Sequence, residues 1–63
     1  MEFVENEIWT AVRTAIEYRC ILPVTSTARR IAAAQPNKQL SQAEIEDVLV
    51  SAAIAARVPM EID

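Results

Sequence analysis

Glycine and histidine are both absent from this sequence, and there is a single cysteine, Cys20. The absence of glycine excludes a Walker loop, a dinucleotide-binding fingerprint and a nucleophile elbow, because each needs glycine where the backbone meets phosphate or turns sharply. One cysteine and scattered carboxylates do not match the ligand spacing of a zinc site, and one cysteine forms no disulfide within the chain. We therefore expect neither a metal nor a cofactor.

The sequence also lacks long apolar runs and a basic N-terminal segment. No stretch approaches the roughly 18 apolar residues that a membrane span needs. The first residues include Glu2, Glu5 and Glu7, where a signal peptide carries basic side chains. A lone cysteine is typical of a reducing compartment. We expect a cytoplasmic protein with no membrane partner.

The length of the chain limits how much stability its own core can supply. The 63 residues are 52% hydrophobic, which favours one folded domain, residues 1–63, over disorder. A core of this size contributes only about 3–5 kcal/mol. Because metals and disulfides are not expected, association with another chain remains as a further source of stability.

Two prolines, Pro23 and Pro36, separate three segments in which apolar residues recur at helical spacing. The pattern predicts helices over residues 6–21, 26–35 and 42–57, packed around one core in an all-α fold. The predicted core consists of Ile8, Trp9, Val12, Ile16, Leu22, Ile31, Leu40, Ile45, Val48, Leu49 and Ala52.

The start of the third helix has the clearest local signal. Ser41 and Glu44 have the spacing of a capping box, in which the serine oxygen accepts from the amide of Glu44 and the carboxylate reaches back. Leu40 and Ile45 have the spacing of the hydrophobic staple that accompanies it. Between the second and third helices, Asn37 is the best candidate for a left-handed turn position.

Two short segments, residues 20–24 and 58–62, have patterns compatible with extended chain. They could pair with each other, although each contains a proline, which donates no hydrogen bond to a ladder. The whole pattern therefore predicts a small three-helix domain with short extended segments as its only other regular structure.

Charge is segregated along the chain. The net charge is −3 over residues 1–17, +4 over residues 18–43 and −4 over residues 44–63, which makes −3 for the whole chain. Affinity for phosphate comes from concentrated Lys and Arg. The acidic total therefore argues against nonspecific nucleic-acid binding, whereas the basic block, residues 19–38, argues for it.

Within the basic block, hydroxyls and arginines at a helix start could hold a phosphate. The candidate phosphate or nucleic-acid contacts are Ser26, Thr27, Arg29, Arg30 and Lys38. The simpler interpretation, which we favour, is an ordinary cap with arginines that face the acids of the other helices. A helix-turn-helix is not convincing, because the third helix would bring Glu44, Glu46 and Asp47 towards phosphate.

The third helix has apolar residues on two sides. One stripe consists of Ile45, Val48, Leu49, Ala52 and Ala56. Val50 and Ile54 point almost the opposite way, although the outer face of such a helix should be polar. Either the helix is covered on both sides within the domain, or a partner covers the second side. The predicted partner interface consists of Val50, Ile54, Ala53 and Arg57.

Catalytic interpretations are weaker. Glu44 and Asp47 lie one turn apart, as paired acid–base carboxylates sometimes do, but the capping box and the helix dipole account for both. Cys20 is near Arg19, a setting in which a thiol can be reactive, but a cysteine on the apolar side of a helix end is more often a core residue. We expect no enzymatic activity.

These features predict a non-catalytic protein–protein interaction module that self-associates through the third helix, as a homodimer for example. The alternative is a small nucleic-acid-binding regulator that uses the basic block, residues 19–38. A further alternative is an acidic inhibitor or accessory subunit of another protein.

Overall fold

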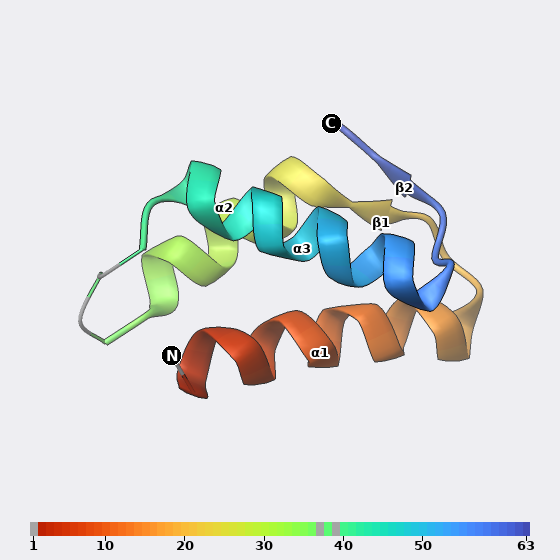
Figure 1. Ribbon diagram of the computed structural model, residues 1–63, viewed down its shortest axis with the longest axis horizontal. Helices are drawn as coiled ribbons and strands as arrows, with labels where there is room; N and C mark the ends of the chain where they lie inside the picture. The colour runs from red at the N-terminus through yellow and green to blue at the C-terminus, as the bar shows by residue number, and fades with distance from the viewer. Residues whose placement is uncertain (1, 37, 39) are drawn as a thin grey trace.

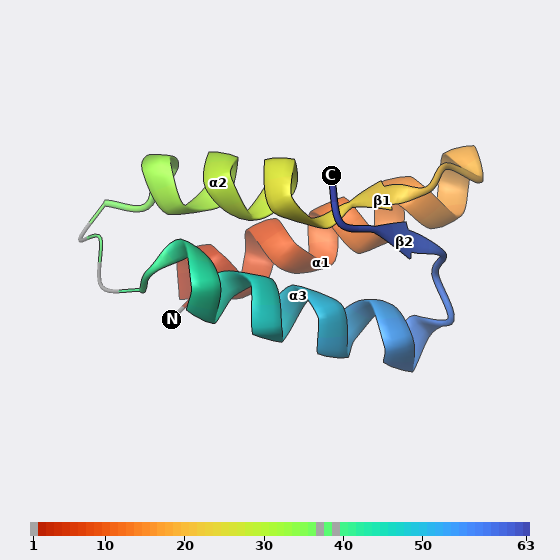
Figure 2. The same cartoon turned by 90° about the horizontal axis from the view of Figure 1, so that it is seen from above.

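The computed structural model describes residues 2–36, 38 and 40–63, and most of them belong to three helices (Figure 1). In chain order the elements are α1 (Glu2–Tyr18), β1 (Leu22–Pro23), α2 (Val24–Ala34), α3 (Gln42–Ala56) and β2 (Met60–Glu61). Helices α1 and α3 run in the same direction, and α2 runs the opposite way beside them (Figure 1 and Figure 2). The predicted all-α, three-helix fold is confirmed.

The two short strands pair with each other, as the extended segments of the sequence allowed. The pairing is parallel, with Leu22 opposite Met60 and Pro23 opposite Glu61. The amide of Leu22 donates to the carbonyl of Pro59 at 2.9 Å. The proline in each segment therefore does not prevent a ladder of two residues, because other residues supply the donors.

Two predicted helix starts were placed too late. Helix α1 begins at Glu2 rather than at residue 6, because Val4 continues its apolar stripe and is buried. Helix α2 begins at Val24 rather than at residue 26. Its N-cap, Pro23, makes no side-chain capping bond.

The predicted capping box of α3 is confirmed. The amide of Glu44 donates to the hydroxyl oxygen of Ser41 at 3.2 Å, and the amide of Ser41 donates to the carboxylate of Glu44 at 3.0 Å. These bonds satisfy two backbone donors that the helix itself leaves without a partner.

Helices α1 and α3 end in the same way. Each is followed by an arginine in the left-handed conformation, Arg19 with φ of 54° and Arg57 with φ of 59°, where glycine is usual. At the end of α1, the amide of Cys20 donates to the carbonyl of Ala15 (3.0 Å) and the amide of Arg19 donates to the carbonyl of Ile16 (3.3 Å). At the end of α3, the amide of Val58 donates to the carbonyl of Ala53 (2.9 Å) and the amide of Arg57 donates to the carbonyl of Ile54 (3.1 Å). Lys38 is also left-handed, with φ of 50°, whereas Asn37 lies outside the described residues.

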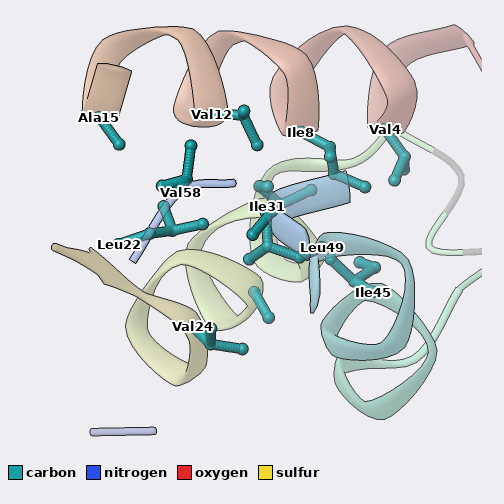
Figure 3. Packing of buried hydrophobic residues seen from close by; sticks show 12 residues of the cluster. Val4, Ile8, Val12, Ala15, Leu22, Val24, Ile31, Ile45, Leu49 and Val58 are labelled. Carbon is teal, nitrogen blue, oxygen red and sulfur yellow. The ribbon is translucent and has the colours of Figure 1, made fainter. Parts of the chain in front are cut away.

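The core lies where the three helices meet, and in Figure 3 the side chains of Val4, Ile8, Val12 and Ala15 point into it from α1. Its buried apolar members are Val4, Ile8, Val12, Ala15, Leu22, Val24, Ala28, Ile31, Ile45, Leu49, Ala53 and Val58. Six of them were predicted: Ile8, Val12, Leu22, Ile31, Ile45 and Leu49. Predicted Leu40 and Ala52 are only partly buried against this cluster.

Three predicted core residues are wrong. Trp9, Ile16 and Val48 are 52%, 53% and 47% exposed. The stripe of α1 that enters the core is centred on Ile8, and at about 100° per residue both Trp9 and Ile16 point to one side of it. On α3 the same holds for Val48, which lies about 100° from Leu49.

Replacing Ser41 with alanine should lower the free energy of unfolding by about 1 kcal/mol, because it leaves an amide at the start of α3 without its acceptor. Ser51→Ala is the matched control. Ser51 is exposed in the middle of α3, where alanine is the better helix former, so this change should be neutral or slightly stabilising. Thermal unfolding of both variants tests the assignment, and equal melting temperatures for Ser41→Ala and wild type would contradict it.

Candidate functional site

The start of α2, predicted as a phosphate contact, holds a carboxylate of the chain itself. Oδ1 of Asp63 accepts from the amides of Thr25 (2.9 Å) and Ser26 (3.2 Å), and the Ser26 hydroxyl donates to Oδ2. Pairing of β1 with β2 brings Asp63 to this place. Because the start of a helix favours negative charge, Asp63 caps α2 in the way an anion would.

These hydrogen bonds change the acidity of Asp63. The hydroxyl of Ser26 has the largest effect and lowers the pKa of the Asp63 carboxyl from its ordinary value of 3.8, against a smaller opposing effect of burial. The capping box acts in the same way on α3, where the backbone and side chain of Ser41 lower the pKa of Glu44. Both carboxylates are therefore held in the charged form that the helix starts require.

The other predicted phosphate contacts are not brought together around this helix start. The guanidinium of Arg30 pairs with Glu7 of α1 at 3.2 Å, and Thr27 is buried. The ammonium of Lys38 donates to the carbonyl of Ala33, near the end of α2 (3.1 Å). Of this set, Arg29 alone is exposed without a hydrogen bond or ion pair to the described residues.

A groove lies between α1 and α2, and its volume is about 270 Å³. Its walls include Thr10, Thr14, Cys20 and the Glu7–Arg30 pair. Pockets that bind small molecules usually have volumes of about 300–1,000 Å³. Cys20 was interpreted as a core residue, but it is exposed, with its thiol donating weakly to the carbonyl of Tyr18.

Potential metal ligands do not gather in the described part of the chain. Within residues 2–36, 38 and 40–63 there is no group of three His, Cys, Asp or Glu side chains placed to hold a metal ion. No buried side-chain nitrogen or oxygen of these residues lacks a hydrogen-bond partner. None of the described helices is both long enough and apolar enough to cross a membrane.

The predicted interface on α3 is not one continuous outward face. Ile54 is 62% exposed, and Val50 is half-buried against the core. Ala53 is fully buried, because the inward stripe of α3 passes through Leu49 and Ala53, about 40° apart around the helix. Placing Ala53 at a partner contact was therefore wrong. Arg57 is exposed and follows the end of the helix.

Exposed apolar side chains gather instead between α1 and α3. Trp9, Arg13 and Ile16 of α1 line a shallow groove together with Ala56 of α3. Val48 lies two helical turns before Ala56 on the same stripe of α3. We call these five residues the α1–α3 face. It contains three of the seven large apolar residues that are exposed in the described chain.

The sequence contained a signal for this face. The buried stripe of α1 together with Trp9 and Ile16 spans about 140° around the helix, from Val4 on one side of Ile8 to Trp9 on the other. Two packed neighbours do not cover so wide an arc when the contacts are centred on Ile8. The side of the arc that carries Trp9 and Ile16 remains in solvent.

Replacing Asp63 with asparagine should destabilise the domain at neutral pH, because the amide oxygen still accepts hydrogen bonds but carries no charge. Since the pKa of Asp63 is lowered on folding, its contribution is present above the unfolded pKa and is lost as pH falls through the folded pKa. The difference from wild type in urea unfolding should therefore shrink between about pH 7 and pH 3.

Glu61→Gln is the matched control for this experiment. It removes the same charge from β2, where the structure shows no hydrogen bond between the carboxylate and a described residue. Its difference from wild type should stay small at every pH. An Asp63→Asn difference that does not change with pH would mean that the carboxylate does not cap α2.

A scan against protein-family models and searches of curated proteins and of solved structures found no match to this chain. Its function is therefore inferred from its own surfaces. Among the described residues, Trp9 and Ile16 of α1 are exposed large apolar side chains that line one groove together with Ala56 of α3.

Proposed function

We propose that this protein is a small, non-catalytic interaction module that binds another protein chain through its α1–α3 face. A single observation carries the proposal: Trp9 and Ile16, each about half exposed, line one groove with Ala56 of α3, and Val48, also about half exposed, lies at intervals of four residues from Ala52 and Ala56. Contiguous apolar surface of this kind marks interaction sites in soluble proteins. Trp and Arg are also the residues that contribute most to binding at such sites, and this face has one of each.

The energetic reason is the small size of the domain. Fully burying a side chain such as valine or isoleucine is worth roughly 1.5–3 kcal/mol, and whole proteins are stable by only about 5–15 kcal/mol. Covering the exposed halves of Trp9, Ile16 and Val48 would therefore add a substantial fraction of the stability of the free chain. This would add stability to a short chain whose single cysteine forms no disulfide within it.

Nucleic-acid binding through residues 19–38 is the second candidate function. The observation in its favour is that this block contains four basic residues and no acid. Against it, Arg30 forms an ion pair with Glu7, and the hydroxyl of Ser26 donates a hydrogen bond to Asp63. Both would have to exchange an internal carboxylate for a phosphate. We therefore place this function second.

Self-association is the form of binding that can be tested directly. Ile16→Lys should shift the association equilibrium towards the monomer relative to wild type, because the α1–α3 face then buries a charge that has no partner. Ile54→Lys is the matched control, with the same change at a helical isoleucine of similar exposure, 62% against 53%, outside this face. Sedimentation velocity over a wide concentration range measures both. The fluorescence of Trp9, the single tryptophan, reports whether this face becomes buried.

The two variants separate the candidate surfaces. Dissociation of Ile16→Lys with retention of association in Ile54→Lys supports the α1–α3 face. Dissociation of Ile54→Lys with retention of association in Ile16→Lys would instead support an interface on the outer side of α3, as the sequence predicted. A wild-type chain that stays monomeric at every concentration, with unchanged Trp9 fluorescence, contradicts self-association.

A further inference from the structure

We infer that the α1–α3 face is occupied by a second copy of this chain, related to the first by a two-fold axis, with the two α1 helices antiparallel. The inference rests on the proposed function and adds to it the partner and its orientation. It depends on how charge is arranged along the two helices that form the face.

On α1 the charges are symmetric about the tryptophan. Glu5, Trp9 and Arg13 follow one another at intervals of four residues, so they share one side of the helix. Glu5 and Arg13 are each about 6 Å from Trp9 along the helix axis, in opposite directions. A two-fold axis through Trp9 therefore places Glu5 of each copy opposite Arg13 of the other. A parallel arrangement would instead bring like charges together.

Helix α3 has the same polarity as α1. Its first turns carry Glu44 and Asp47, and Arg57 follows its last residue, just as Arg19 follows α1. Because the two helices run in the same direction (Figure 1 and Figure 2), their acidic first turns lie at one end of the domain, and Arg19 and Arg57 lie at the other end, where Glu17 is also present. A two-fold rotation places the acidic end of one copy against the basic end of the other, so both ends are complementary at once.

The arginines at the basic end are available for such contacts. Arg13, Arg19 and Arg57 are exposed, and none of them makes an ion pair with a described residue. Arg13 lies between Trp9 and Ile16 on the groove itself. The face thus has an apolar centre with charges beyond it, which is the usual organisation of a protein interface.

Small side chains on α3 allow a partner helix to come close. Ala52 and Ala56 lie on the same stripe as Val48 and are partly buried against the core. A helix that packs over alanine can approach more closely than one that packs over larger residues. An indole from the second copy can therefore reach the groove that Trp9 and Ala56 line.

Charge reversals on α1 test the orientation. Glu5→Arg and Arg13→Glu should each raise the dissociation constant of the dimer by about tenfold, because each turns two attractive contacts into repulsive ones. The double reversal, Glu5→Arg with Arg13→Glu, should bring the constant back to within about threefold of wild type, because in an antiparallel pair the charges have simply changed places. Sedimentation equilibrium at low ionic strength measures all four chains.

Two control variants account for the change in net charge. Glu61→Arg and Arg29→Glu make the same reversals at exposed positions away from α1, on β2 and on α2. Their dissociation constants should stay within about twofold of wild type at low salt. Arg13→Gln removes the attraction without adding repulsion. If circular dichroism shows that a reversal has unfolded the chain, this variant supplies the test, with an expected weakening of about threefold.

The outcomes for orientation and for self-association are distinct. If wild type dimerises and Ile16→Lys does not, but the double reversal remains as weak as the single ones, then the antiparallel arrangement is wrong and the proposed function stands. If wild type is monomeric throughout, both fail. If the dimer forms and Arg29→Glu weakens it as much as Arg13→Glu, net charge rather than pairing controls association, and the inference is overturned.

Discussion

Three alanines, Ala15, Ala28 and Ala53, lie buried where the helices of this domain approach one another. Side chains of this size bring helix backbones close together, so the space between the helices is filled by few atoms. Larger apolar residues beside these contacts cannot turn into the core without overpacking it. Trp9 and Ile16 are therefore left at the edge of α1, and the surface that they form is a direct result of how thin the core is.

Local features of the sequence were sufficient for most of the fold. The prolines, the apolar spacing and the box at Ser41 and Glu44 concern neighbours within a few residues, and they predicted the three helices and the cap of α3, although two helix starts were placed too late. The rotation of a helix about its own axis depends on where the other helices lie. Helix α1 carries an apolar arc wide enough for several rotations, so spacing alone could not decide whether Ile8 or Trp9 points inwards. The same uncertainty placed Ala53 on the wrong side of α3.

The cap of α2 is a contact that local patterns do not contain. Capping signals are read from residues within one helical turn, whereas Asp63 reaches Ser26 across 37 positions of sequence. That contact exists because the pairing of Leu22 with Met60 directs the following residues along the start of α2. The sequence correctly indicated that the start of α2 offers hydrogen-bond donors to an anionic group, which is the carboxylate of Asp63. Their occupant could be identified only when the two strands were placed side by side.

The arginines that follow α1 and α3 show how this chain folds without glycine. A non-glycine residue in the left-handed conformation costs roughly 1–2 kcal/mol in the folded state. Glycine would avoid this cost, but it would also enlarge the set of conformations open to the unfolded chain, at an entropic cost of about 0.4–1 kcal/mol. At Arg19 and Arg57 these two costs partly offset each other. The backbone therefore gives up little by using arginine, and each helix end gains a long cationic side chain that glycine could not provide.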